Sequence, residues 1–299
     1  MSSGNYRAGF VAVVGRPNVG KSTLINTIVG SKISIVTRKP QTTRHRILAL
    51  HTTDTEQIAF VDTPGLHRNA RKVMNRMMNK TAANALIDAD LVLFVTEASR
   101  WTDEDQDVLH RLHDSKASAI AVLNKIDKVH PREELLRVIG EMAQRYAFSD
   151  VVPISATRGE NLDALMKLIP KFLPESPPLF PQDMVSDRSE AFHTAELIRE
   201  KLTIQLRQEI PYGLTVQIEH SERDEYGVAI HAVIWVERNS QKGIVVGKGG
   251  AVLKRVGRAA RLELKKELGV PVHLELWVKV KDNWADSEKD LLSLGYDAP

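Results

Sequence analysis

The sequence GRPNVGKS occupies residues 15–22, directly after the apolar run 9–14 and directly before the helix-like run 23–28. It matches the pattern G-x-x-x-x-G-K-[ST] in the strand, loop and helix context that the pattern requires. Glycines let successive backbone N–H groups face phosphates, the lysine adds a positive charge, and the serine hydroxyl can bind Mg²⁺. The pattern therefore predicts a loop that binds a nucleoside triphosphate. The residues assigned to it are Gly15, Arg16, Pro17, Asn18, Val19, Gly20, Lys21, Ser22 and Thr23.

The base is selected by the sequence NKID at 124–127, which ends the apolar run 119–123. The Asp127 carboxylate can accept hydrogen bonds from both N1–H and the 2-amino group of guanine, whereas adenine has no 2-amino group and would leave the carboxylate underused. Asn124 and the stem of Lys125 are expected to brace the loop and cover the ring. The predicted base is guanine.

Two weaker segments add to this site. The sequence DTPG, made of Asp62, Thr63, Pro64 and Gly65, ends the apolar run 57–61. Its carboxylate is expected to hold Mg²⁺ through water, and its glycine N–H to contact the γ-phosphate. After the run 151–154, backbone N–H groups of Ser155 and Ala156 are expected to face the guanine O6.

Composition places the chain among globular proteins with room for two domains: 299 residues, 42% apolar and 26% charged. No apolar run reaches the length of a membrane helix, and we expect a protein made and kept in the cytosol. The absence of cysteine excludes disulfides and thiolate metal sites, so any metal must be held by oxygen or histidine. The net charge of +3 is small, but the window 242–281 alone carries +7, from ten basic and three acidic residues.

A cluster of prolines divides the chain. Five of its 13 prolines fall within 170–181, which predicts a stiff connector between two units. We expect one domain over 1–175, a proline-rich linker over 176–187, and a second domain with a C-terminal tail over 188–299.

The two halves have different patterns of elements. In the first, short apolar runs alternate with helical stretches, which predicts an α/β domain with a mostly parallel sheet. The runs 47–51 and 57–61 are joined by only five residues, so one antiparallel edge strand is expected. The second half predicts an α+β unit with a helix over 190–207, strands over 214–219, 228–237 and 272–280, and two helices around residues 247–250.

The second half contains the loop sequence GKGG at 247–250, entering a predicted helix over 251–268. One face of that helix is apolar, and basic residues recur at spacings of 4, 3 and 4 on the other. A glycine-rich turn lets a nucleic-acid backbone approach peptide N–H groups. The candidate RNA-binding residues are Gly247, Lys248, Gly249, Gly250, Lys254 and Arg258.

Taken together, these residues make the first half similar to a Ras-like P-loop GTPase of the translation-factor-related class, and the second half similar to a type II KH domain, whose GxxG loop clamps about four nucleotides. The resemblance implies GTP hydrolysis, with Lys21, Thr43 and Gly65 in the catalytic centre. It also implies Mg²⁺ held by Ser22, by Asp62 through water and by a threonine of the switch segment QTTRH at 41–45. Thr43 is the preferred threonine and Thr42 the second choice, since nothing in the segment fixes the register.

Two positions bear on the rate of hydrolysis. Leu66 stands where Ras-type enzymes carry the glutamine that orients the attacking water, so intrinsic hydrolysis is expected to be slow and the residue that positions the water is unassigned. Asn18 resembles the residue that helps to hold K⁺ in cation-dependent relatives, which makes K⁺ a second expected cofactor.

Over essentially the whole chain the sequence resembles the Era family, through PNVGKSTL, QTTRHRI, DTPGLH, NKID, HLELWVKVK and WADSEKDLLSLGY. This resemblance implies a bacterial switch that binds GTP or GDP and acts in assembly of the 30S ribosomal subunit. It further implies binding near the 3′ end of 16S ribosomal RNA rather than to DNA, and peripheral association with the cytoplasmic face of the inner membrane.

Two alternatives stay open. One is a GTP-regulated binding module with vestigial hydrolysis, whose C-terminal domain grips a protein or a membrane. The other is an RNA-modifying enzyme, but the sequence offers no cysteine and no convincing His/Asp/Glu cluster; His110 and His113 are expected on a helix surface. Aromatic residues for base stacking are sparse, since Trp235, Trp277 and Trp284 fit core or rim equally well.

Overall fold

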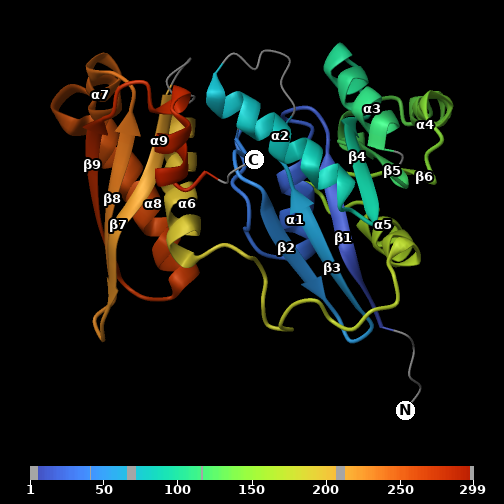
Figure 1. Ribbon diagram of the computed structural model, residues 1–299, viewed down its shortest axis with the longest axis horizontal. Helices are drawn as coiled ribbons and strands as arrows, with labels where there is room; N and C mark the ends of the chain where they lie inside the picture. The colour runs from blue at the N-terminus through green and yellow to red at the C-terminus, as the bar shows by residue number, and fades with distance from the viewer. Residues whose placement is uncertain (1–5, 41, 66–71, 116, 207–212, 297–299) are drawn as a thin grey trace. The chain divides into compact units, whose positions relative to one another are not determined.

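The computed structural model describes residues 6–40, 42–65, 72–115, 117–206 and 213–296 (Figure 1). The chain divides into two compact units. Unit 1 contains Met1–Arg71, Asn75–Asp187 and Pro299, and unit 2 contains Lys72–Met74 and Arg188–Ala298.

Unit 1 is built on a six-stranded sheet in the order β2-β3-β1-β4-β5-β6. The strands are β1 (Arg7–Val14), β2 (Ile47–Thr52), β3 (Glu56–Asp62), β4 (Leu91–Glu97), β5 (Ala119–Asn124) and β6 (Asp150–Pro153). All neighbours are parallel except β2 and β3, which form an antiparallel hairpin at the edge of the sheet. The predicted mixed, mostly parallel sheet with one antiparallel edge strand is therefore confirmed.

Helices cover both faces of this sheet. They are α1 (Lys21–Val29), α2 (Val73–Ile87), α3 (Asp103–Ser115), α4 (Glu134–Arg145) and α5 (Leu162–Leu168). Side chains of α1 and α5 join one buried apolar cluster with residues of β1 and β3, whereas side chains of α2, α3 and α4 join a second cluster with the opposite-facing residues of β1, β4 and β5. Central strands buried on both faces explain their continuous apolar runs.

The topology brings the sequence motifs to one edge of the sheet. The loop at 15–22 follows β1, the DTPG segment follows β3, the NKID segment follows β5, and Ser155 lies shortly after β6. Carboxyl ends of parallel strands share one edge, where ligands of open α/β sheets bind. Four motifs that are far apart in sequence therefore meet.

The proline-rich segment 176–187 lies against unit 1, rather than only connecting the two units. The Gln57 carboxamide accepts hydrogen bonds from the backbone N–H groups of Leu179 and Phe180 at 2.8 and 2.9 Å. The N–H of Leu50 in β2 donates to the Val185 carbonyl at 3.0 Å. Proline stiffness suggested a connector, but the buried Gln57 supplies the polar partner that anchors the segment.

Unit 2 contains α6 (Glu190–Gln205), β7 (Leu214–Arg223), β8 (Val228–Val236), α7 (Asn239–Val246), α8 (Ala251–Leu268), β9 (Val272–Val280) and α9 (Glu288–Ser293). Its sheet has the order β7-β8-β9, with β7 antiparallel and β9 parallel to β8. Apolar side chains of α6 and α8 pack on one face of this sheet, with Val245 of α7. This is the element order and sheet of a type II KH domain, as predicted.

Two details of unit 2 differ from the prediction. Strand β7 continues to Arg223 because the ladder passes through an irregularity between Ile218 and His220, which breaks the alternation of apolar and polar residues. The stretch treated as a C-terminal tail contains the short helix α9, and Trp284 just before it is fully buried. Within the described residues, no helix is long and apolar enough to cross a membrane.

Candidate functional site

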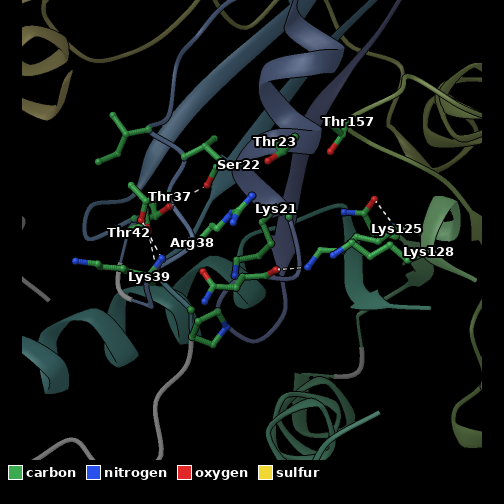
Figure 2. Close-up of a pocket in the computed structure, with 18 of the residues that line it drawn as sticks. Lys21, Ser22, Thr23, Thr37, Arg38, Lys39, Thr42, Lys125, Lys128 and Thr157 are labelled. Atoms are coloured by element: carbon green, nitrogen blue, oxygen red, sulfur yellow. Dashed lines mark hydrogen bonds between the residues drawn. The ribbon is translucent and has the colours of Figure 1, made fainter. Parts of the chain in front are cut away.

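A cleft of about 670 Å³ opens at the carboxyl edge of the unit 1 sheet (Figure 2). Its volume is in the range of small-molecule sites in proteins. Among the residues predicted for nucleotide binding, the cleft is lined by Pro17, Asn18, Gly20, Lys21, Ser22, Thr23, Gly65, Asn124, Lys125 and Asp127, together with both switch threonines, Thr42 and Thr43. The structure therefore brings the loop at 15–22, the DTPG segment and the NKID segment around one cavity.

Lys21 begins α1, and its side chain turns back under the preceding loop. Its ammonium donates hydrogen bonds to the carbonyls of Gly15 and Arg16 at 2.8 and 3.1 Å. The side chain is only 6% exposed, and burial lowers its pKa to about 8 despite the nearby Asp62 carboxylate. A buried cation whose hydrogen bonds, among the described residues, go to neutral carbonyls is ready to receive the negative charge of a phosphate.

Three oxygen-bearing side chains from three segments meet beside Lys21. The Ser22 hydroxyl donates to Asp62 Oδ2 at 2.8 Å and lies 2.9 Å from Thr43 Oγ1. Asp62 is fully buried, and its Oδ1 atom has no hydrogen-bond partner among the described residues. Burial raises the pKa of Asp62, opposed by the Lys21 charge and by hydroxyl hydrogen bonds. Two hydroxyls and a buried carboxylate with a spare oxygen fit a hard divalent cation such as Mg²⁺.

The two candidate threonines have different surroundings. Thr43 joins Ser22 and Asp62 as described, and it is 8% exposed. The Thr42 hydroxyl instead donates to the Lys39 carbonyl at 2.7 Å and lies 2.7 Å from Thr37 Oγ1. This geometry favours Thr43 over Thr42 as the metal-binding threonine.

The remaining residues of the DTPG segment are arranged around the same strand end. The Thr63 hydroxyl is buried and donates to the Val13 carbonyl at 3.0 Å, so it holds β3 to β1 rather than lining the cleft. Pro64 is buried beside it. Gly65 lies against Pro17, where an added Cβ would approach the proline ring to 2.9 Å. Gln41 and Leu66 lie outside the described residues.

Asn124 ties three loops of the cleft together. Its Nδ2 donates to the Val19 carbonyl at 2.8 Å, and its Oδ1 accepts from the N–H groups of Lys125 and Ala156 at 2.8 and 3.0 Å. The side chain is 2% exposed. Gly20 has φ of +105°, and a Cβ there would lie 2.3 Å from Asn124 Nδ2. Glycine is therefore needed at position 20 for the loop to approach Asn124.

The Asp127 carboxylate is oriented by Ser155, whose hydroxyl donates to Oδ1 at 2.6 Å and lowers the pKa of Asp127. An ionised carboxylate is the acceptor that guanine requires. Ser155 and Ala156 are themselves buried. The N–H groups of Ser155 and Ala156, both expected to face guanine, instead donate to the Glu160 carbonyl at 3.1 Å and to Asn124 Oδ1 at 3.0 Å. The Lys125 ammonium bonds the Asn18 carbonyl at 2.7 Å and Glu97 at 3.0 Å, which places its stem across the cleft.

Sequence reasoning missed several residues of the cleft. The lining also contains Ile35, Val36, Thr37, Arg38, Lys39 and Lys128, several of which are labelled in Figure 2. Thr157, which directly follows the predicted Ser155 and Ala156, lines the cleft as well. The basic pair Arg38 and Lys39, just before the switch threonines, was a signal in the sequence that this segment could face phosphates. Arg16 was assigned to the loop, and its guanidinium is anchored away from the cleft on the buried Asp105 at 2.9 Å. Thr96 and Thr102 hydroxyls also bond that carboxylate.

In unit 2, the loop 247–250 joins α7 to α8. Gly247, Gly249 and Gly250 have φ of +72°, +58° and +78°, which few residues other than glycine adopt readily. A Cβ at Gly247 would lie 2.5 Å from a methyl group of Val252, whereas none of the described atoms lies within 4 Å of a Cβ at Gly249 or Gly250. Lys248 and Gly249 are exposed. The loop thus presents an open stretch of backbone beside a cationic side chain.

The predicted faces of α8 are observed. Val256, Ala260 and Leu264 are buried, and the basic residues Lys254, Arg258, Arg261 and Lys265 are exposed. Of the tryptophans, Trp284 is core, Trp277 is 59% exposed, and the half-buried Trp235 donates to Gln217 at 3.0 Å. His110 and His113 are exposed on α3. The described residues contain no His/Asp/Glu group suited to hold a metal ion.

Comparison with known proteins agrees with both units. Residues 10–125 match a family model described as a 50S ribosome-binding GTPase, and residues 209–285 match one described as a KH domain. GTPase Era of Actinobacillus pleuropneumoniae serotype 5b (strain L20) is 48% identical over 289 residues, which cover 96% of this chain and 95% of the relative.

Two solved structures align with almost the entire chain. An Era variant from Aquifex aeolicus bound to GDP·AlF4⁻ is 39% identical, covers 98% of this chain and 100% of its own, and has a TM-score of 0.93. An Era in complex with MgGDPNP and nucleotides 1506–1542 of 16S ribosomal RNA has the same identity and coverage and a TM-score of 0.94. The level of identity, the coverage and the order of the two units together show that this chain belongs to the Era family of GTPases.

Proposed function

We propose that the chain is a GTP-dependent switch that binds the 3′ end of 16S ribosomal RNA through its KH domain during assembly of the 30S subunit. The observation that carries the proposal is the contact of Ser22, Thr43 and Asp62, because it joins the phosphate loop, the switch segment and the DTPG strand. A γ-phosphate bound beside this cluster would order both neighbouring segments. The related Era bound to MgGDPNP and 16S RNA supports both ligands.

In the nucleotide cleft, each group has a defined task. Backbone N–H groups of the loop 15–22 and the Lys21 ammonium hold the phosphates, and Asp127 reads the guanine edge while Asn124 keeps the three loops in place. Ser22, Thr43 and Asp62 would hold Mg²⁺, Asp62 through water. When bound, the ion neutralises charge that develops on the transferred phosphoryl group. Gly65 presents its N–H to the same group, and Thr23 lines the cleft beside Ser22. Ser155 and Ala156 act through their contacts with Asp127 and Asn124.

Intrinsic hydrolysis is proposed to be slow, because Leu66 has no group that can orient water. Asn18 lines the cleft with φ of +64°, an exposed side chain and its carbonyl bonded to Lys125. We propose that its side chain helps to hold K⁺ near the phosphates. We expect GTP turnover to be faster in potassium buffer than in sodium buffer. The Asn18→Ala variant should lose this difference. Equal turnover in the two buffers would remove the K⁺ proposal.

The KH unit is proposed to clamp single-stranded RNA at the loop 247–250, with Lys254 and Arg258 contacting its phosphates. Nucleotide-dependent ordering around Thr43 and Gly65 would then change RNA affinity. The test is the binding of a labelled RNA equivalent to nucleotides 1506–1542, with a non-hydrolysable GTP analogue, with GDP and without nucleotide. Identical affinity in the three states contradicts the coupling.

Gly249 gives a sharp control for this test. Gly249→Asp places a carboxylate where RNA phosphates are expected. The Cβ meets none of the described atoms within 4 Å, and Asp and Asn tolerate the φ of +58° better than most residues, so both variants carry the same small backbone strain. Gly249→Asn has the same shape without the charge. RNA binding abolished by Asp and largely kept by Asn is expected. Binding untouched by Gly249→Asp would leave the GTPase with a different effector.

The alternative is a module with vestigial hydrolysis that grips a protein or a membrane. The salt dependence of binding distinguishes it from the RNA-binding switch. Binding through several RNA phosphates weakens steeply as salt rises, whereas an apolar protein interface does not. A cytoplasmic location and peripheral contact with the inner membrane are part of the proposal and are tested by fractionation and by vesicle flotation.

A further inference from the structure

The outward surface of α8 carries six cationic side chains within 13 residues. We call these residues the α8 cation face: Lys254, Arg255, Arg258, Arg261, Lys265 and Lys266. All six are exposed. Only two of the six, Lys254 and Arg258 in the first half of the helix, belong to the set proposed above for RNA. The other four extend along the helix to its last turn.

The α8 cation face is not neutralised by the helix on which it lies. The two acidic residues of α8 pair instead with side chains of α6: Glu263 with Lys201, and Glu267 with His193. Across the described parts of the chain, none of the six cations has an ion pair or a side-chain hydrogen bond. By contrast, Arg137 on α4 pairs with two glutamates of its own helix.

The spacing of the cations gathers their charge along one line. Lys254, Arg258, Arg261 and Lys265 recur at 4, 3 and 4 residues, so they lie in one stripe that rises about 16 Å along the helix. Like charges at these spacings repel and destabilise a helix. An unneutralised stripe is therefore unfavourable in the free protein and becomes favourable against a linear polyanion.

The apolar side of α8 favours a nucleic-acid partner over a membrane for the α8 cation face. The apolar side of α8, with Val256, Ala260 and Leu264, is buried in the core of unit 2. Leu262 is the exposed large apolar side chain beside the cations, at 53%. Binding to a lipid surface through an amphipathic helix needs an apolar face free to enter the membrane. The surface instead continues from the loop 247–250.

We propose that the α8 cation face binds the phosphodiester backbone of RNA that flanks the nucleotides clamped by the loop 247–250, without reading its sequence. This rests on the proposed RNA-binding function and extends it. A GxxG loop holds only about four nucleotides. The RNA in the complex of the related Era is the 37-nucleotide stretch 1506–1542, most of which lies beyond such a clamp.

The test compares two RNAs and two charge-matched variants of the full chain. The RNAs are the 37-nucleotide stretch and the tightest-binding six-nucleotide fragment tiled from it. Arg261→Gln/Lys265→Gln removes two cations at the end of α8 far from the loop. Arg223→Gln/Lys289→Gln removes two exposed cations elsewhere in unit 2. Affinities are measured by fluorescence anisotropy from 50 to 300 mM KCl.

For the long RNA, we expect the α8 variant to flatten the slope of log K against log[salt] by about 1.4, since each lost single-strand phosphate contact removes about 0.7. The six-nucleotide fragment should bind both variants as it binds the parent chain, and the control variant should keep the parent slope. An unchanged long-RNA slope in the α8 variant overturns the inference.

Two further outcomes separate the possible errors. If the parent chain binds neither RNA, the proposed RNA function itself fails, and the inference fails with it. The parent chain and the α8 variant are also tested for binding to vesicles of phosphatidylglycerol. If the α8 variant loses vesicle binding while its RNA affinity and salt slope stay at parent values, the cation face serves lipid headgroups and the proposal is wrong.

Discussion

Replacing Asn124 by alanine should lower the stability of unit 1, because this one side chain holds three loops of the nucleotide cleft together. The substitution removes three hydrogen bonds: buried ones with Val19 and Ala156, and a half-buried one with Lys125. Each such bond contributes about 1 kcal/mol net, and the partners lose their acceptor or donor in a buried place. The expected cost is about 3 kcal/mol in the free energy of unfolding of unit 1. For a unit of this size, that lowers the midpoint of thermal unfolding by about 6–12 °C.

The assay is differential scanning calorimetry of the full chain with and without GDP. The transition that GDP shifts upward belongs to unit 1, because a ligand stabilises the unit that binds it. Asn161→Gly is the matched control: Asn161 has φ of +61°, an exposed side chain and one hydrogen bond, to the Pro153 carbonyl, so its loss should cost about 1 kcal/mol. A fall for Asn124→Ala no larger than that of Asn161→Gly would refute the account of the three-loop clamp.

Three other outcomes are expected. Asp127→Asn should weaken GTP binding at least tenfold and admit xanthine nucleotide, because the amide suits the altered 2-position; nucleotide competition measures this, and unchanged GTP affinity would place the base elsewhere. Arg199→Met should lower the free energy of unfolding of unit 2 by about 3–5 kcal/mol, since it removes the charge that the buried Glu196 carboxylate contacts through two nitrogens at 2.7 and 2.6 Å; in calorimetry, the double variant with Glu196→Leu should lose less than the single one. Burial lowers the pKa of His51, so the unfolded state takes up its proton first and the stability of unit 1 should fall as pH drops below about 6.5; His51→Gln should flatten that decline in denaturant titrations, and an identical profile would contradict it.

The sequence predicted the features that depend on contiguous backbone. The loop 15–22, the NKID segment and the loop 247–250 are short stretches whose residue types dictate a backbone shape, and strand order brings them to their places. Features that join distant segments carried no such signal. The sequence favoured Thr43 without fixing the register of the switch segment, and nothing in it coupled Arg16 to Asp105, because these contacts arise only when separate loops pack.

The far end of the chain shows the same limit. The stretch after β9 has no long apolar period, so the sequence predicts a tail there and does not decide whether Trp284 is a core or a rim residue. In the structure, Trp284 is fully buried beside Tyr296, with ring centroids 6.0 Å apart. One large side chain can add core to a unit without leaving a periodic pattern in the sequence.

The docking of the segment 176–187 has a practical consequence for solubility. Strand β2 would otherwise be an uncovered sheet edge, the kind of surface on which other chains pair and aggregate. The contact of Leu50 with Val185, and the bond from the Leu48 N–H to Asp187 at 3.0 Å, seal part of it. A GTPase fragment cut at residue 175 would also remove the hydrogen bonds of Gln57 with Leu179 and Phe180, so the piece that stays monomeric in solution should be the one that runs through Asp187.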